Sequence, residues 1–251
     1  MANYFDKNKT YLGDCLELLP KVESNSIDAI ITDPPYGTTA CKWDSVIPFE
    51  PMWEQLNRII KPNGAIVLFG SEPFSSALRM SNIKNFKYDW VWNKRKVTGF
   101  LNSKKRPLVQ HETIHLFYKK QCTYNPQLHE NKLNRNFKGS LQKPNTDNYG
   151  IQKNYISELD SKKSYPRSII EQTGVVGNSK EKLAHPTQKP ILLMGYLIKT
   201  YTNEKETVLD FTMGSGSTGV AAKNLNRNFI GIEQDENYFN IAQDRINSTL
   251  F

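Results

Sequence analysis

The sequence predicts an α/β fold in which a mostly parallel sheet carries helices on both faces. Short apolar runs alternate with segments whose apolar residues recur at helical spacing, which is typical of alternating strands and helices. The apolar runs are nearly continuous, as in strands that are covered on both faces. A glycine-rich segment at 214–219 lies between one such run and a predicted helix. In open α/β folds, loops of this kind bind ligands at the carboxyl edge of the sheet.

The first 120 residues hold most of the predicted sheet. A short strand ends at a turn, Gly13-Asp14, and a helical turn follows it. The next apolar run is closed by Pro34-Pro35, which cannot continue a strand. By the same criteria, strands are expected at 27–31, 65–70, 88–92 and 112–120, and helices at 49–60 and 72–80.

The composition changes after residue 120. From 121 to 182 the chain is rich in Asn, Lys and Ser and shows little periodicity, and this stretch is too long for an ordinary loop. We therefore predict a subdomain at 121–182, inserted between the two halves of the main domain at 1–120 and 183–251. In the second half, helices are expected at 191–201 and 236–246, and strands at 207–211 and 228–233.

The bulk composition limits the class of protein. The net charge of +8 and the pI of about 9.2 indicate either a polyanionic partner or a generally basic, solvated surface. No apolar stretch approaches the ~18 residues of a membrane span, and the N-terminus lacks the apolar region of a signal peptide, so a cytoplasmic protein is expected. Three cysteines without a CxxC pair and four scattered histidines favour neither a disulfide framework nor a metal site.

The segment DFTMGSGSTG matches a nucleotide-binding pattern. Gly214, Gly216 and Gly219 follow a predicted strand, a helix comes next, and Glu233 ends the following strand. In such a unit the glycines allow close backbone approach to the ligand, and the acid binds ribose hydroxyls. Because only one strand and one helix remain after this unit, the rest of the sheet must come from 10–120. The fold is therefore expected to be a circularly permuted Rossmann-like domain.

Asp210, at the tip of the strand before the glycines, narrows the choice of ligand. Its carboxylate would repel a pyrophosphate and attract an ammonium group. Residues 214–219 contain no lysine for a phosphate, which argues against a P-loop. A ligand with ribose at one end and an amino-acid ammonium at the other is S-adenosylmethionine, which we predict as the cofactor.

The run ITDPPYG places a second set of polar groups at the end of a predicted buried strand. A purely structural turn would explain a lone Asp-Pro pair, but the four residues together fit methylation of an exocyclic amine. Asp33 and the carbonyl of Pro34 would accept the two amino hydrogens, and the two prolines would fix the direction of that carbonyl. Tyr36 would stack on a base extruded from a duplex. Methyl transfer would then depend mainly on positioning and electrostatics.

Both motifs, DPPYG and DFTMGSGSTG, resemble those of the amino-group DNA methyltransferases, and their order resembles the permuted beta group of that family. The resemblance covers nearly the whole chain apart from 121–182, and it implies a methyltransferase fold in which this insert recognises the target. GDCLE and HPTQKP resemble the family's segments at the adenine and methionine ends of the cofactor. The implied catalytic residues are Asp33, Pro34, Pro35 and Tyr36, and the implied cofactor-binding residues are Asp14, Cys15, Asp33, Thr187, Gln188, Lys189, Asp210, Phe211, Gly214, Gly216, Ser217, Thr218 and Glu233.

The resemblance also bears on the target base. No cysteine follows a proline, so the covalent chemistry of cytosine C5 methylation is not expected. In the family, Asp at the first position of the loop is typical of adenine N6 enzymes and Ser of cytosine N4 enzymes. We therefore favour adenine N6 and keep cytosine N4 as the alternative. An RNA or protein N-methyltransferase and a non-catalytic nucleic-acid-binding module are further alternatives.

The basic segment KRKVTGFLNSKKR, at 94–106, has six basic residues and no acidic one. A solvated face is the usual explanation of such a run, but beside a base-modifying loop we predict a loop that follows the DNA backbone. The insert at 121–182 is rich in Asn and Gln, which read base edges. Double-stranded DNA is thus the predicted partner, and the family adds a homodimer and a cognate restriction endonuclease as candidates. The predicted DNA-binding residues are Lys94, Arg95, Lys96, Lys104, Lys105 and Arg106.

Overall fold

The chain divides into two compact units in the computed structural model, one comprising Met1–Asn125 with Ser168–Phe251 and the other Pro126–Arg167. The second unit lies within the stretch 121–182 that the sequence predicts as an insert. Its described strands form two short antiparallel pairs, β6 (His129–Glu130) with β9 (Lys163–Ser164) and β7 (Asn145–Thr146) with β8 (Gly150–Ile151). The residues that the structure describes are 4–38, 44–130, 145–146, 150–151, 162–175, 181 and 187–249, so part of the predicted insert lies outside them.

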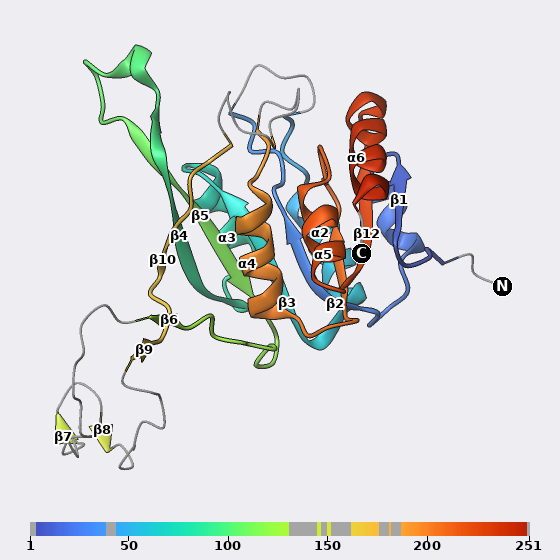
Figure 1. The fold of residues 1–251 in the computed structure, drawn as a ribbon, viewed down its shortest axis with the longest axis horizontal. Helices are drawn as coiled ribbons and strands as arrows, with labels where there is room; N and C mark the ends of the chain where they lie inside the picture. The colour runs from blue at the N-terminus through green and yellow to red at the C-terminus, as the bar shows by residue number, and fades with distance from the viewer. Residues whose placement is uncertain are drawn as a thin grey trace. The chain divides into compact units, whose positions relative to one another are not determined.

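The first unit is built on one sheet (Figure 1). Within the described residues its eight strands follow the order β1 (Lys9–Leu12), β12 (Asn228–Glu233), β11 (Thr207–Asp210), β2 (Ile27–Thr32), β3 (Ile60–Gly70), β5 (Val109–Phe117), β4 (Phe86–Thr98) and β10 (Ile169–Glu171). Neighbouring strands are parallel except where β5 runs antiparallel to β3 and β4. The mostly parallel sheet is confirmed, and the pairing of β11 with β2 gives the permuted order.

Helices cover both faces of the sheet, as predicted. The helices α4 (Ile191–Tyr201), α5 (Ser217–Asn224) and α6 (Glu236–Ser248) pack on one face, and α1 (Cys15–Leu18), the 3₁₀ turn η1 (Leu19–Lys21), α2 (Phe49–Ile59) and α3 (Phe74–Ser81) on the other. Ile31 of β2 belongs to the cluster with α4, whereas its neighbour Ile30 belongs to the cluster with α2. This two-sided burial explains why the apolar runs are continuous rather than alternating. None of the described helices has the length and apolar character that crossing a membrane requires.

The basic segment at 94–106 spans the end of a strand and the turn that follows it, whereas the sequence predicts a loop throughout. The strand expected at 88–92 is β4, which continues to Thr98, and the 3₁₀ turn η2 (Phe100–Asn102) joins it to β5. Beyond Asn93 the hairpin has no apolar pattern to reveal it. It is held by backbone pairing with β5, as between Thr98 and Val109.

The permuted order brings distant segments to one edge of the sheet. Because β2, β11 and β12 are parallel neighbours, their carboxyl ends lie together. The loop after Thr32, the glycine segment after Asp210, and Glu233 at the end of β12 therefore converge.

Candidate active site

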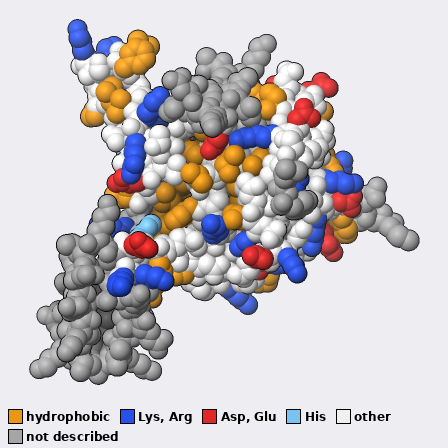
Figure 2. Space-filling model, viewed as in Figure 1, with side chains coloured by type: hydrophobic (Ala, Val, Ile, Leu, Met, Phe, Trp, Pro, Cys, Tyr) orange, Lys and Arg blue, Asp and Glu red, His pale blue; other side chains and the backbone are white. Residues whose placement is uncertain are grey.

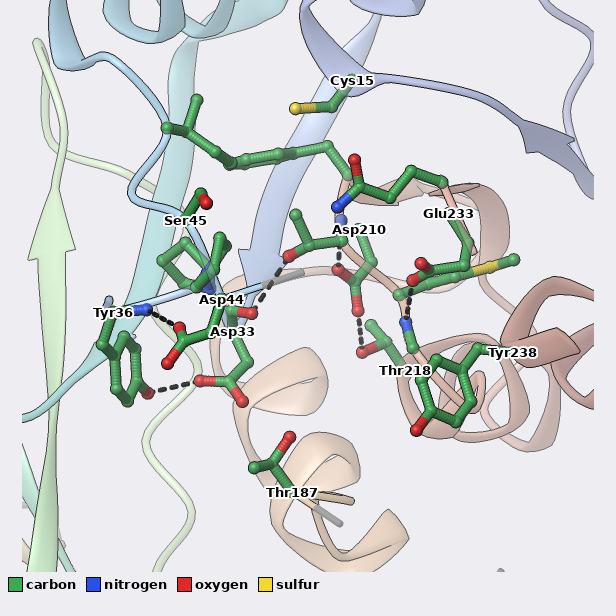
Figure 3. Close-up of a pocket in the computed structure, with 18 of the residues that line it drawn as sticks. Cys15, Asp33, Tyr36, Asp44, Ser45, Thr187, Asp210, Thr218, Glu233 and Tyr238 are labelled. Carbon is green, nitrogen blue, oxygen red and sulfur yellow. Dashed lines mark hydrogen bonds between the residues drawn. The ribbon is translucent and has the colours of Figure 1, made fainter. Parts of the chain in front are cut away.

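A pocket of about 330 Å³ opens at this edge of the sheet (Figure 3). The loop after β2, the start of α1, the segment between β11 and α5, and the end of β12 supply its walls. Its volume lies within the range of ordinary small-molecule sites, roughly 300–1,000 Å³. It is lined by all but one of the predicted catalytic and cofactor-binding residues: Asp14, Cys15, Asp33, Pro34, Pro35, Tyr36, Thr187, Gln188, Lys189, Asp210, Phe211, Gly214, Ser217, Thr218 and Glu233.

Gly216 is the exception, and its predicted contact with the cofactor stays a prediction. Its φ of +77° lies in the left-handed region, and a Cβ there would lie 3.0 Å from the Cβ of Ala242. At Gly219, a Cβ would lie 2.4 Å from Cδ1 of Ile246. These two glycines therefore let α5 begin close against α6, while Gly214 is the motif glycine that lines the pocket.

The Asp33–Tyr36 loop follows the carboxyl end of β2, and the carboxylate of Asp33 lines the pocket. The Asp33 carboxylate accepts hydrogen bonds from the Tyr36 hydroxyl and the Lys189 ammonium. The backbone carbonyl of Asp33 accepts one from the Thr212 hydroxyl at 3.1 Å, which ties this loop to the glycine segment. Burial raises the pKa of Asp33 above its ordinary value, against the opposing effect of Lys189.

Asp44 holds the outer part of this loop, and the sequence analysis missed it. Its Oδ1 accepts from the backbone N–H of Tyr36 at 2.8 Å and of Gly37 at 2.9 Å, and its Oδ2 from that of Thr38 at 2.9 Å. The Tyr36 ring also stacks on Phe74, with centroids 5.1 Å apart. These contacts fix the ring at the pocket wall. An acid shortly after a Pro-Pro turn is a usable signal, because a turn leaves N–H groups that need an acceptor.

Lys189 lies at the centre of a buried ion-pair network. Its side chain is only 9% exposed, and its ammonium contacts Asp33 and lies 3.5 Å from Oε2 of Glu112. Burial disfavours the charged ammonium, but the two carboxylates outweigh that effect and raise the pKa of Lys189. Glu112, on β5, was also missed, because a strand pattern does not distinguish an ion-paired acid from a solvated one.

Glu112 also binds Lys94, one of the predicted DNA-binding residues. The Lys94 ammonium lies 3.1 Å from Oε1 of Glu112, and its side chain is largely buried. Although burial opposes its charge, Lys189 and Lys94 together lower the pKa of Glu112. Lys94 therefore belongs to the buried network. Arg95 pairs with Glu171 at the surface, and the other predicted cations are exposed on the hairpin: Lys96, Lys104, Lys105 and Arg106.

Asp210 is buried beneath the glycine segment. Its Oδ2 accepts from the Thr218 hydroxyl at 2.5 Å, and its Oδ1 accepts from the Thr32 hydroxyl and from the N–H of Thr212 at 3.2 Å. Burial raises its pKa to about 6. A carboxylate has about four acceptor positions, so these three bonds leave capacity for a cationic ligand.

Glu233 joins the end of β12 to the glycine segment. Its Oε2 accepts from the N–H of Gly214 at 2.8 Å, and its Oε1 accepts from the N–H of Asp235 at 2.9 Å. Burial raises the pKa of its carboxyl, while these backbone N–H groups lower it. The first turn of α6 adds Tyr238 to the same wall, a residue that sequence analysis did not select.

Asp14 and Cys15 line the pocket at the start of α1. Asp14 caps this helix, since its Oδ1 accepts from the N–H of Leu16 at 2.7 Å. Burial raises the pKa of the Cys15 thiol to about 12, and that of Cys122 to about 11, so neither of these two cysteines is an activated nucleophile. In the part of the chain that the structure describes, no cluster of three His, Cys, Asp or Glu side chains could hold a metal ion.

The permuted sheet and the pocket that joins both motif loops define the class of permuted α/β methyltransferases. Comparisons with known proteins agree: the N6/N4 methyltransferase family model, described as DNA methylase, matches residues 27–244. The chain therefore belongs to the DNA methylase family.

Individual relatives match most of the chain. The type II methyltransferase M.HpaI of Haemophilus parainfluenzae is 30% identical, over 94% of this chain and 73% of its own length. The crystal structure of the M1.HpyAVI–SAM complex is 28% identical with a TM-score of 0.62, over 94% of this chain and 98% of that one. The cytosine-N4-specific PvuII DNA methyltransferase, 19% identical, shares the fold with a TM-score of 0.67 over 97% of this chain and 88% of its own.

Proposed function

We propose that this DNA methylase transfers a methyl group from S-adenosylmethionine to the exocyclic N6 of an adenine extruded from duplex DNA. The observation that carries the proposal is the convergence of the Asp33–Tyr36 loop and the glycine segment on one pocket. The relative M1.HpyAVI was solved as a complex with SAM, which supports the choice of cofactor. Adenine rests on the Asp at the first position of the loop, as the family resemblance implies.

The acids of the pocket fit the donor groups of S-adenosylmethionine. Asp14 would accept from the adenine amine, Glu233 from the ribose hydroxyls, and Asp210 from the methionine ammonium. Glu233 and Asp210 are both buried carboxylates that keep acceptor positions beyond their bonds to the backbone and to threonine hydroxyls. When bound, the cofactor supplies an electrophilic methyl group on a sulfonium.

The catalytic loop holds and activates the target amine. Asp33 accepts one amino hydrogen and the carbonyl of Pro34 the other, which frees the nitrogen lone pair from the ring. With S-adenosylmethionine bound, the nitrogen would take the methyl group, and the electron pair of the broken carbon–sulfur bond would stay on sulfur. The amine then gives up one proton to Asp33, a suitable acceptor because burial raises its pKa. Solvent takes that proton afterwards.

The Lys189 ammonium must leave the Asp33 carboxylate when the target amine binds there. The Glu112 carboxylate can then become its main partner. Oε2 of Glu112 is buried, lies 3.5 Å from the Lys189 ammonium, and has no hydrogen bond among the described residues. A small shift of the ammonium toward Glu112 therefore keeps its charge paired within the pocket. Lys189 is in this proposal a positioning residue that neutralises the empty site and moves aside for substrate.

Glu112→Gln is expected to lower kcat by about tenfold, the value of a lost charged hydrogen bond. It is also expected to move the acid limb of the kcat/KM profile to lower pH. Glu112 raises the pKa of Asp33 by charge repulsion, so without it Asp33 stays ionised, and active, at lower pH. Rates measured across pH test this, with Glu54→Gln on the exposed face of α2 as the control. An acid limb that stays in place or moves to higher pH contradicts the proposed coupling.

Mass spectrometry of nucleosides tests the reaction itself. Genomic DNA from a host that lacks adenine methylation and makes this protein is expected to contain N6-methyladenine. DNA from cells making the Asp33→Asn variant should lack it. Accumulation of N4-methylcytosine would establish the alternative target. Absence of both, with tritiated methyl appearing in RNA or protein, would overturn the DNA assignment. Sequencing of the same DNA locates the modified site.

The exposed cations of the hairpin support duplex DNA as the partner. Lys96, Lys104, Lys105 and Arg106 are exposed beyond the pocket edge of the sheet, where they suit contacts to phosphates. A homodimer, a cognate restriction endonuclease and a cytoplasmic location stay predictions from the family resemblance and the composition.

A further inference from the structure

The tip of the β4–β5 hairpin carries two strongly exposed apolar side chains. Leu101 is 84% and Phe100 73% exposed, more than any other large apolar residue in the described part of the chain. Val97 and Leu108 on the hairpin's two arms are also exposed. Exposed apolar groups that gather in one place indicate a binding surface more often than scattered ones do.

Basic side chains surround this apolar tip. Lys96 precedes it on β4, and Lys104, Lys105 and Arg106 follow it, all exposed. Figure 2 shows apolar and basic side chains together on the hairpin at the upper left. An apolar tip within a ring of cations is complementary to duplex DNA, which offers phosphates outside and apolar base faces inside.

The tip is an ordered turn. Gly99, with a φ of +84°, precedes η2 as its N-cap, and the N–H of Asn102 donates to the carbonyl of Gly99 at 2.9 Å. The N–H groups of Lys105 and Arg106 donate to the carbonyl of Asn102 at 2.8 and 3.0 Å. The backbone therefore holds Phe100 and Leu101 outward without help from a core.

The hairpin extends from the same sheet edge as the pocket. β4 is antiparallel to β5, and β5 to β3, so β4 points in the direction of β3 and its parallel neighbour β2. At its base, Lys94 is linked to Asp33 through Glu112 and Lys189. Phe100 lies six residues further, at most about 20 Å along an extended strand. A two-stranded ribbon of this kind fits a major groove about 12 Å wide.

We propose that Phe100 and Leu101 form a wedge that enters the DNA stack and fills the space left by the extruded target base. This inference rests on the proposed function, because only an enzyme that removes a base from the duplex leaves such a space. Extrusion costs a few kcal/mol of lost stacking and pairing. Apolar side chains inserted between bases offset part of this cost, since they replace stacking contacts and keep water out.

Two variants and two substrates test the wedge. The substrates are duplexes carrying the site found by sequencing, one correctly paired and one with an abasic position opposite the target base. With Phe100→Ala combined with Leu101→Ala, kcat/KM is expected to fall about tenfold to a hundredfold on the paired duplex. On the abasic duplex it should return to within about threefold of wild type, because extrusion is then easier. Met80→Ala on α3, where the methionine is also exposed, is the control and should change neither value.

The charged arm of the hairpin gives a contrasting pattern. The double variant Lys104→Gln with Lys105→Gln is expected to weaken the binding of both duplexes to the same extent. It should also make that binding depend less steeply on salt concentration. For the wedge variant, an equal loss on both duplexes, or no loss, overturns the proposal. So does conversion of a wild-type dimer to a monomer in light scattering, which would make the tip an interface between two copies. If the wild-type protein methylates no DNA, both the proposed function and the wedge are refuted. If the wild type is active, the behaviour of the Phe100 and Leu101 variant tests the wedge alone.

Discussion

Asp33→Asn is expected to reduce methyl transfer about a thousandfold, while cofactor affinity changes little. The amide keeps the size of the side chain but replaces one acceptor oxygen by a donor. The Tyr36 hydroxyl, the Lys189 ammonium and the target amine all need an acceptor here, so the one remaining oxygen cannot serve them and the NH2 group faces at least one of these donors. Lys189 retains Glu112 as a partner, so the chain should still fold.

Single-turnover incorporation of tritiated methyl into the site duplex measures this effect. Asp244→Asn, which alters an exposed acid of α6, is the matched control and should methylate at the wild-type rate. A calorimetric titration with S-adenosylmethionine checks that the pocket of the Asp33 variant is intact. If that variant binds cofactor and transfers methyl groups normally, Asp33 is not the acceptor for the amine.

Glu233→Gln is expected to weaken S-adenosylmethionine binding by about thirtyfold. The carboxylate accepts from two backbone N–H groups, of Gly214 and Asp235, and in the proposed function also from the ribose. Glutamine has one acceptor oxygen, so its amide must face one of these N–H groups donor to donor. Loss of a charged hydrogen bond, at about 1.5–3 kcal/mol, gives this order of magnitude.

Calorimetric titration again provides the measurement, with the melting temperature of each variant recorded beside it. Glu236→Gln lies three residues further, at the exposed start of α6, and should leave the affinity unchanged. An unchanged affinity in the Glu233 variant would remove the ribose role. A lowered melting temperature with normal affinity would restrict Glu233 to holding the glycine segment in place.

The two motif loops could be predicted because each lies within one short, continuous stretch of the sequence. Asp33 to Tyr36 forms one turn after a buried strand, and Asp210 to Thr218 one strand, loop and helix start. The apolar run before each loop indicates the strand that leads into it. Their meeting in one pocket then follows from the parallel order of β2, β11 and β12.

Residues that act across the sheet could not be predicted in the same way. Asp44 binds N–H groups six to eight residues before it, and Glu112 meets Lys189 from a strand far away in sequence. No pattern around Glu112 marks its contact, and the signal for Asp44 is limited to its place shortly after the Pro-Pro turn, because acids on loops and strands are common and usually solvated. The pairing of Lys94 with Glu112 could not be predicted for the same reason, since only the register of β4 against β5 brings the two residues together.

The fold class, the permuted order, the Asp33–Tyr36 loop and the glycine segment follow from the amino-acid sequence, because periodicity and motif chemistry are local properties. How these parts are held and how their charges are paired depends on the three-dimensional packing. That packing forms the Lys189–Asp33–Glu112 network, the bonds from Asp44 to the loop that follows Pro35, the close approach at Gly216 and the exposed tip of the hairpin. Burial and charge pairing depend on which strands become neighbours, and that is a property of the whole sheet.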